Sequence, residues 1–559
     1  MNPYYITTPI YYVNDRPHIG HCYTSLLADV AARFQRLSRG QEMGSAKGAP
    51  GEVFLLTGTD EHADKVVTSA SAHGKSAQEW ADINAEQFKA AFAWMNISND
   101  DFIRTTEPRH RERVPVYIQK LMDSGDIYKG EYTGWYDEGQ EEYVPENSAR
   151  EAGYKSAISG RPLVKRTEPC YFFKLSKYGK PLADHLAANP TFVQPDSRRS
   201  EILGRIRQGL NDIPISRPVT DDPATQWGIR VPGDATNRIY VWIDALFNYL
   251  TVVDTPQRRP LWPAAVHLIG KDILWFHAAI WPALLMALRA ADAKEFGWVT
   301  PPSMIFGHGW WISNGQKMSK SLGNFIDLEK LQAYADRYSI DAVRWYLAKD
   351  GPMSGADADF SYTKFVEVYN ADLANGIGNC ASRVANMVEK YFGTLPTPEA
   401  GGSLPAGSVA APPQHARFNF PALCSGAVAR AGAKAAALDL AGVLAEGIEL
   451  IRNVDVYINE TAPFKLAKTI DTDPTAKARL ATILYNCAEA VRVASVLMSS
   501  AMPTKMGQLW QAWNCVPKAG EPLATLCAFG GASGLRPGSM IAKGEALFMR
   551  ADAALPEPA

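Results

Sequence analysis

The opening stretch of the chain alternates strand and helix patterns, and this constrains the fold more than any other feature. Residues 4–13 are rich in aromatic and β-branched side chains and predict a buried strand, which we expect Pro9 to end. Residues 18–37 carry apolar side chains at helical spacing, and 53–56 predict a second short strand. Strand, helix and strand form a βαβ unit, whose ligand is expected at the carboxyl ends of the strands, beside the helix N-terminus.

A second block of this kind follows much later in the chain. Residues 239–242 and 266–269 predict strands, and 273–290 predict a buried helix. Because the two blocks are far apart, the sheet is expected to be interrupted by an insertion, residues 116–226, which is dotted with Gly and Tyr and predicts a small separate lobe.

The last part of the chain is predicted to be helical from about residue 326. The Ala- and Leu-rich stretches 427–451 and 476–499 are typical of long helices in an antiparallel bundle. Residues 393–415 are rich in Gly, Pro, Ala and Ser and predict an exposed loop or linker.

Composition excludes several classes of protein. A formal net charge of −2 excludes binding of nucleic acid by bulk positive charge, although a local basic groove would not show in this total. The seven cysteines lie far apart and fit reduced thiols in a cytosol. No secretory signal is evident, and residues 273–288 are too short and too polar to span a membrane, so we expect a cytoplasmic protein with no membrane partner.

His18, Ile19, Gly20 and His21 lie where the first strand turns into the first helix. The two imidazoles share one helical face and can reach one phosphate chain, while Gly20 leaves room for a nucleotide. The helix N-terminus offers backbone N–H groups to anionic oxygens. Taken alone, the string fits a capping turn with surface histidines equally well.

A second chemical motif begins at Lys317 and runs Lys317, Met318, Ser319, Lys320, Ser321, Leu322, Gly323, Asn324. Two ammonium groups on a polar loop suit the charge that develops on a polyphosphate. For any Lys–Ser pair considered singly, a solvated turn is the alternative.

In this order, the two strings match the HIGH and KMSKS signatures, and the chain resembles the class I aminoacyl-tRNA synthetases. Within that class it most resembles the methionyl-tRNA synthetases, over nearly its whole length. The strings that carry this resemblance are residues 8–12, 58–62, 240–245, 269–273 with Phe276 and His277, and 375–383. The resemblance implies an α/β fold, in which a Rossmann-like parallel-sheet catalytic domain is split by a small insertion lobe and followed by an α-helical bundle that binds the anticodon.

The expected domain boundaries follow from the patterns and the resemblance together. They are 1–115 with 227–325 for the catalytic domain, 116–226 for the connective lobe, 326–375 for a linking region, 376–535 for the helical domain and 536–559 for a C-terminal tail.

The resemblance also implies a methionine pocket with Asp60 holding the α-amino group. The other lining residues that it implies are Ile10, Tyr12, Trp242, Ala245, Tyr249, Ile273, His277 and Trp281. Ile273, His277 and Trp281 are spaced for one helix face, and a thioether packs well against aromatic rings. The alternative is that this stripe is simply core against the sheet.

For ATP, the resemblance implies contacts from both motifs and from the ribose-binding pair Gly270 and Asp272. His18, His21, Lys317 and Lys320, with Mg²⁺ on the polyphosphate, would neutralise oxygens whose charge rises in the transition state. Arg217 would help amino-acid activation, although a surface arginine in a salt bridge explains it equally.

At the anticodon, the resemblance implies Asn379, Arg383, Pro463 and Phe464. Bases splayed from an RNA loop need planes to stack on and polar groups for their edges. Many family members have Trp where Phe464 stands, so a stacking face remains but an N–H donor is lost. The alternative is a core aromatic at Phe464 and a surface charge at Arg383.

Metal ligands are missing where many relatives carry zinc knuckles. Residues 137–140 occupy the first knuckle position, and Cys170 is isolated in the lobe, so we predict no structural zinc and no metal site of the protein's own. Residues 43–51 form an added Gly- and Ala-rich stretch of unknown role. Since the chain has no room for an appended dimerisation domain, we expect a monomer.

The reaction implied is ATP-dependent activation of L-methionine to methionyl-adenylate and transfer to the 3′ end of initiator and elongator tRNA(Met). Other interpretations are a class I synthetase for a different amino acid, such as cysteine, and a noncatalytic RNA-binding paralogue. Intact His18, His21, Lys317 and Lys320 speak against the paralogue. Nucleotidyltransferases lack the long helical part and rank last.

Overall fold

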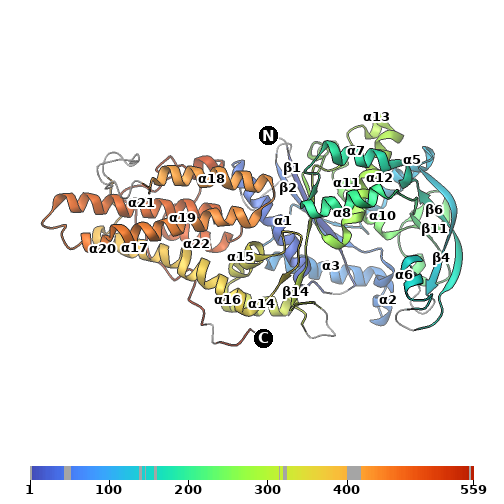
Figure 1. Cartoon of the computed structure of the whole chain (residues 1–559), viewed down its shortest axis with the longest axis horizontal. Coiled ribbons are helices and arrows are strands. Elements are labelled where there is room, and N and C mark those ends of the chain that lie inside the picture. Colours follow the sequence, from blue (N-terminus) through green and yellow to red (C-terminus); the bar gives the residue numbers. More distant parts are fainter. Residues whose placement is uncertain are drawn as a thin grey trace.

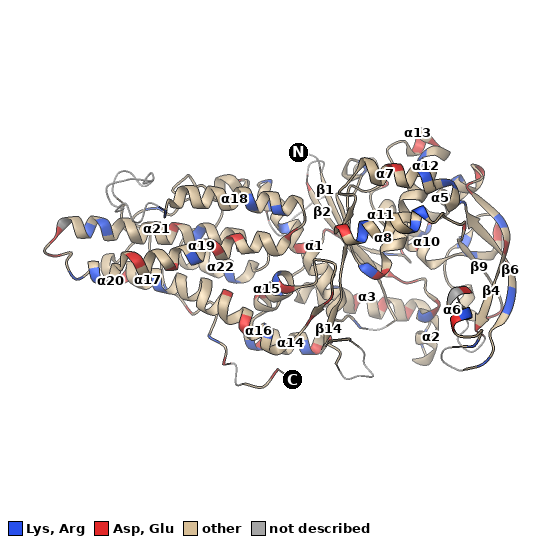
Figure 2. Cartoon of the chain, viewed as in Figure 1, with Lys and Arg blue, Asp and Glu red and all other residues tan. Residues whose placement is uncertain are grey.

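The computed structural model describes residues 3–14, 16–42, 52–137, 142–144, 146–156, 160–313, 315–318, 324–398, 417–552 and 555–558. The molecule is elongated, with a sheet-containing half at one end and a helical bundle at the other (Figure 1). Lys and Arg are interspersed with Asp and Glu along the whole length, in keeping with the net charge of −2 (Figure 2).

The sheet-containing half is built on six strands, and every neighbouring pair is parallel. In spatial order they are β3 (Asp101–Arg104), β2 (Val53–Asp60), β1 (Tyr4–Tyr12), β12 (Val266–Gly270), β13 (Ile305–His308) and β7 (Val193–Gln194). The predicted α/β fold is therefore confirmed, and the carboxyl ends of all these strands lie at one edge of the sheet.

Alternate side chains of the central strands enter two different cores. Ile6 and Leu55 pack on one face of the sheet, beneath α1 (Ile19–Ser38). Tyr5 and Phe54 belong to the core on the other face. That core is covered by α5 (Val114–Asp123), α11 (Asn248–Thr251), the π-helical turn η4 (Phe276–Ile280) and α12 (Trp281–Ala291). Because both faces of the sheet are buried, the sequences of these strands are continuous apolar runs.

Pro9 does not end the first strand, which continues to Tyr12. The register between β1 and β2 shifts between Thr7 and Ile10, so Pro9 lies at an irregularity where its missing N–H costs no ladder hydrogen bond. The strand therefore carries its chain onward to the candidate site.

The inserted segment forms a four-stranded antiparallel sheet and also contributes β7 to the main sheet. The antiparallel strands are β5 (Glu142–Val144), β4 (Ile127–Asp137), β6 (Val164–Phe173) and β8 (Ile213–Pro214). A smaller sheet next to it contains β10 (Arg230–Val231), β11 (Asp234–Ile239) and β9 (Ser216–Pro218).

The prediction of a strand over 239–242 is wrong. Ile239 ends β11, and α10 (Val241–Leu246) begins two residues later. Tyr240 is the N-cap residue of this helix, and its N–H donates to the Ile215 carbonyl. The helix buries Ile243 and Leu246. A short run of β-branched and aromatic residues cannot distinguish a strand from a buried helix, and tertiary burial decided for the helix.

The remaining helices of the first half lie around these sheets. They are α2 (Asp64–Ala72), α3 (Ala77–Trp94), α4 (Pro108–Arg111), α6 (Glu146–Glu151), η1 (Leu175–Tyr178), α7 (Gly179–Ala188), α8 (Asp196–Arg207), α9 (Pro223–Gln226), η2 (Arg259–Leu261), η3 (Lys271–Ile273) and α13 (Ala293–Phe296). A hairpin of β14 (Trp311–Ser313) and β15 (Gln316–Lys317), joined by β16 (Ala358–Asp359), leads to the helical half.

The helical half begins with α14 (Leu328–Tyr338) and is dominated by long helices. They are α15 (Ile340–Asp350), α16 (Tyr362–Val368), the π-helix η6 (Tyr369–Gly378), α17 (Asn379–Phe392), α18 (Phe420–Ala436), α19 (Leu440–Thr461), α20 (Pro463–Leu466), α21 (Pro474–Met498), α22 (Pro503–Ala512) and α23 (Leu523–Leu526). Within the described ranges, Thr475–Met498 has the length and apolarity to cross a membrane, and its most apolar 18-residue stretch is completely buried inside the protein.

The single helix predicted over 427–451 is in fact two helices. Leu438 adopts a φ of 57°, which breaks the helix, and the Asp439 side chain accepts a hydrogen bond from Gly442 N at 2.9 Å to start α19. A cap of this kind satisfies a free backbone donor at the helix start. The predicted loop 43–51, and residues 399–415 of the predicted loop 393–415, lie outside the described residues.

Candidate active site

Four of the strands deliver the predicted site residues to one edge of the sheet. The chain leaves β1 toward His18, β2 ends at Asp60, and β12 ends at Gly270. β13 ends at His308 and leads to the hairpin that carries Lys317. The sequence elements far apart in the chain are therefore brought together by the parallel order of the strands.

His18 and His21 form a reciprocal cap at the start of α1. The His18 side chain accepts from Gly20 N at 3.1 Å, and His18 N donates to Nδ1 of His21 at 3.2 Å. Because each Nδ1 accepts, the proton of each neutral ring is on Nε2. Burial and the neighbouring His18 lower the pKa of His21 well below its ordinary value. In this structure His21 is therefore a neutral ring whose Nε2–H can donate a hydrogen bond.

The segment after the second motif packs directly on this turn. Ile19 N donates to the Ile326 carbonyl at 3.2 Å, and the Phe325 ring lies 5.2 Å from the His18 ring. The described segment that follows the second motif therefore lies against the first motif. Lys317 lies within the described residues, whereas the predicted site residue Lys320 lies outside them.

Trp310 organises the cations beside this site. The ammonium groups of Lys271 and Lys317 lie 4.6 and 4.4 Å from its ring. Its indole N–H donates to Asp272 at 3.1 Å. A Cβ at Gly270 would lie 2.6 Å from an Asp272 oxygen, so a larger residue there would displace the Asp272 carboxylate. Trp310 was not singled out from the sequence, where only its place after a strand and two glycines marked it.

A small apolar cavity of about 30 Å³ lies beside the first motif's strand. Its lining includes the predicted residues Ile10, Tyr12, Asp60, Trp242, Ala245, Tyr249, Ile273 and His277. Trp281 lies behind this wall, where its indole donates to His267 at 3.2 Å and its ring faces Tyr249. The Trp242 ring stacks on Phe276, with ring centroids 4.2 Å apart.

His277 contributes to this cavity as a neutral ring. Its Nδ1 lies 3.0 Å from the Ile273 carbonyl, so it donates there, and Nε2 accepts from the Tyr249 hydroxyl at 2.8 Å. Burial lowers the pKa of His277 to about 4. The cavity is therefore a low-dielectric environment with fixed dipoles.

Asp60 is the one acidic side chain in that lining. It is 3% exposed, and no described residue donates a hydrogen bond to its Oδ1. Burial and the nearby Asp244 raise the pKa of Asp60 well above its ordinary value. A buried carboxylate oxygen with no partner is costly, so this geometry calls for a donor from a ligand.

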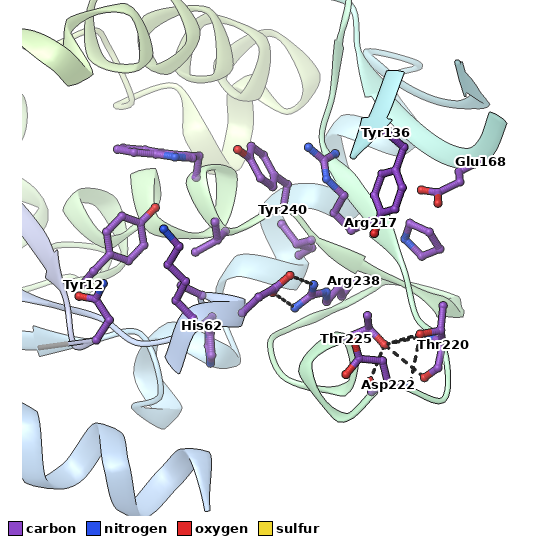
Figure 3. Close-up of a pocket in the computed structure, with 18 of the residues that line it drawn as sticks. Tyr12, His62, Tyr136, Glu168, Arg217, Thr220, Asp222, Thr225, Arg238 and Tyr240 are labelled. Carbon is purple, nitrogen blue, oxygen red and sulfur yellow. Dashed lines mark hydrogen bonds and ion pairs between the residues drawn. The ribbon is translucent and has the colours of Figure 1, made fainter. Parts of the chain in front are cut away.

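A larger cavity of about 620 Å³ adjoins the first and shares Tyr12 and Trp242 with it (Figure 3). It lies between the inserted lobe and the residues that follow β2. Arg217 lies on its wall with its guanidinium 4.2 Å from the Tyr240 ring. Within the described chain, no carboxylate forms an ion pair with Arg217, which argues against the salt-bridge alternative.

The predicted anticodon residues lie in the helical half. Arg383 on α17 pairs with Asp455 on α19 at 3.1 Å, and α19 leads through Ala462 into Pro463 and Phe464. Asn379 is the first residue of α17. Phe464 is 47% exposed, which excludes the alternative of a core aromatic.

The described ranges contain no group of three or more His, Cys, Asp or Glu that could hold a metal ion. Cys170 is buried, and burial raises the pKa of its thiol to about 11. The absence of zinc remains a prediction, since residues 138–141 lie outside the described set.

Comparison with known proteins agrees with this geometry. The family "tRNA synthetases class I (M)" matches residues 4–153 and 151–385. The methionine–tRNA ligase of Streptomyces coelicolor is 41% identical over 98% of this chain and 96% of its own, and that of Bacillus subtilis is 36% identical over 99% and 78%. Mycobacterium tuberculosis methionyl-tRNA synthetase, solved in complex with methionyl-adenylate, superposes with a TM-score of 0.82 at 33% identity, covering 98% of this chain and 100% of that one. This chain therefore belongs to the class I methionine–tRNA ligase family.

Proposed function

We propose that this chain activates L-methionine with ATP and transfers it to the 3′ end of tRNA(Met). The observation that carries the proposal is that the unpartnered Oδ1 of Asp60 lies at a small apolar cavity, next to the first motif and the segment that follows the second. A free amino acid with a thioether side chain fits this arrangement. Its ammonium donates to Asp60, and its side chain packs against the aromatic wall of the cavity.

In the first step the methionine carboxylate attacks the α-phosphorus of ATP, which enters as its Mg²⁺ complex, and pyrophosphate leaves. His18 and His21 donate hydrogen bonds to the phosphates from their Nε2–H groups, and Lys317 and Lys320 place positive charge on them. Such donors stabilise oxygens whose charge rises in the transition state. Gly270 and Asp272 hold the ribose.

In the second step a hydroxyl of the terminal tRNA ribose attacks the carbonyl carbon of the adenylate, and AMP leaves. The larger cavity supports this step, because it adjoins the methionine cavity. Arg217 on its wall helps amino-acid activation in the first step. Asn379, Arg383, Pro463 and the exposed Phe464 bind the anticodon of initiator and elongator tRNA alike. We place the reaction in the cytoplasm, catalysed by a monomer without structural zinc.

Substitution of Asp60 tests the proposal. Asp60→Asn keeps the size but removes the charge that pairs with the ammonium, so the KM for methionine in ATP–pyrophosphate exchange should rise about 10-fold or more, with the KM for ATP nearly unchanged. An unchanged KM for methionine would show that the amino group is bound elsewhere.

A further inference from the structure

A buried chain of side chains connects the end of β2 with α10 and α4. His62 Nδ1 lies 2.5 Å from one oxygen of Asp244, and His110 Nε2 lies 2.8 Å from the other. All three side chains are almost completely buried. His110 Nδ1 reaches Thr251 Oγ1 at 3.1 Å. None of these groups has a part in the reaction as proposed above.

The hydrogen bonds among these side chains indicate which groups donate to Asp244. The Thr251 hydroxyl lies 3.1 Å from the Asn248 carbonyl and 3.1 Å from His110 Nδ1. His110 donates to Asp244 from Nε2, because a carboxylate oxygen can only accept. Asp244 then receives N–H donors on both oxygens, and its negative charge is compensated inside the protein.

The hydrogen-bonded row of His62, Asp244 and His110 joins the two walls of the methionine cavity. His62 is two residues after Asp60, and Asp244 lies on α10 between Trp242 and Ala245, which line the cavity. The intervening Glu61 is itself fixed by Arg104 at 2.7 Å and by Thr59. The ammonium-binding wall is therefore tied to the apolar wall through one carboxylate.

We infer that His62 and His110 are positioning residues that, through Asp244, hold the Asp60 carboxylate at the distance from the apolar cavity that a free α-amino acid requires. This inference rests on the proposed function. It assigns to the two histidines the selection of substrates that carry an ammonium group, although neither histidine lines the methionine cavity.

Electrostatics supports the same role. Asp60 faces Asp244, Glu61, Tyr12 and Tyr240, and burial followed by the Asp244 charge raises its pKa. Loss of either histidine removes a hydrogen-bond donor from Asp244, so the negative charge of Asp244 is less compensated. That charge then repels a negative charge at Asp60 more strongly. The loss should therefore weaken ammonium binding by charge as well as by position.

Two methionine analogues separate this role from a merely structural one. L-Methioninol keeps the ammonium and the thioether, whereas 4-(methylthio)butanoate keeps the thioether and carboxylate but has no ammonium. As inhibitors of pyrophosphate exchange, they report on the two walls independently. In His62→Ala, the Ki of L-methioninol should rise about 10-fold, and that of 4-(methylthio)butanoate should stay within about two-fold.

Conservative variants keep the test valid if an alanine variant does not fold. The amide of His62→Asn takes the place of Nδ1 and that of His110→Gln the place of Nε2, so each keeps one donor to Asp244 but loses the imidazole ring. Both should give intermediate values for L-methioninol. The exposed His73 offers a matched control, and His73→Ala should change neither analogue.

The pH dependence gives a second readout. Because Asp60 must be ionised to bind the ammonium, a raised pKa of Asp60 moves the acid limb of the methionine KM profile to higher pH in His62→Ala and in His62→Asn. Equal weakening of both analogues, or no change in either the analogues or the acid limb, would overturn the inference. Failure of the proposed function is distinguishable, because the unmodified protein would then show no methionine-dependent exchange.

Discussion

At the scale of single residues, function here depends on what neighbours do to a side chain. The two histidines of the first motif are shaped by a reciprocal cap, which fixes their tautomers before any substrate binds. Gly20 makes this cap possible, because a Cβ at that position would lie 3.0 Å from the His18 ring. The glycine is therefore needed for the position of an imidazole as well as for space around a nucleotide.

Gly20→Ala tests this reading of the cap. The added methyl should push the His18 ring away and lower the rate of pyrophosphate exchange by about 10-fold or more, since a misplaced donor loses much of its transition-state effect. Gly204→Ala is the control, because a Cβ on Gly204 in α8 has no neighbour within 4 Å. Equal rates in the two variants would contradict the role of the cap.

Buried neutral histidines also give stability a pH dependence. Burial lowers the pKa of His277 to about 4, while an unfolded histidine titrates near 6.5. As the pH falls from 6.5 towards 4, the unfolded chain binds a proton that the folded chain refuses, so stability decreases by up to about 1.4 kcal/mol per pH unit for this group.

Urea unfolding at pH 7 and pH 5 measures this effect. The free energy of unfolding should fall between these values, and it should fall less steeply in His277→Gln, which has no proton to gain. Identical pH slopes for the variant and the unmodified protein would show that His277 is not held neutral.

At the scale of elements, the sequence predicts what periodicity and caps can report. The order of β1, α1 and β2, the strand at 266–269 and the place of the first motif between β1 and α1 are all confirmed. The strand over 239–242 is wrong because burial in α10 outweighs local propensity. The contact of Trp310 with Asp272 and that of His62 with Asp244 were missed. They join residues far apart in the chain, and no local sequence pattern encodes them.

Trp310 offers a test of the hairpin element that carries Lys317. Trp310→Ala removes the ring that both ammonium groups contact. Lys271 keeps its ion pair with Asp357, so the KM for ATP should rise about five-fold or more because the Lys317 ammonium loses its cation–π contact. Trp310→Phe keeps a ring but loses the N–H to Asp272, and should lie between the two. An ATP KM that is the same in all three proteins would exclude Trp310 from nucleotide binding.

The second motif carries its own expectation. Lys320→Ala should lower the rate of pyrophosphate exchange by about 10²-fold, because one of the cations that stabilise the leaving pyrophosphate is lost. A rate within a few-fold of the unmodified protein would contradict the role of Lys320.

At the scale of the whole molecule, one buried cation joins the catalytic half to the helical bundle. Arg344 on α15 is fully buried and pairs with Asp29 of α1 at 2.7 Å. It also donates to the carbonyls of Met95, Ser500 and Ala501. Burial alone would raise the pKa of Asp29. The positive charges of Arg33 and Arg344 outweigh this effect and lower the pKa to about 2. The helix that begins with the first motif is thereby fastened to the end of α21 (Figure 1).

Arg344→Met should break this connection and destabilise the protein by roughly 3 kcal/mol, because buried carbonyls and part of the Asp29 charge lose their donor. Aminoacylation, which needs both halves, should fall more than pyrophosphate exchange, which needs only the catalytic half. The exposed Arg289 on α12 is the control. An equal loss in both reactions would show that the link only stabilises the catalytic half.

The most direct measurement is ATP–pyrophosphate exchange with each of the twenty amino acids in turn. If the apolar cavity and Asp60 together select a thioether-bearing amino acid, L-methionine alone should drive rapid exchange, and the same preparation should charge tRNA(Met). Rapid exchange with another amino acid such as cysteine, or none with methionine, would contradict the assignment of this site.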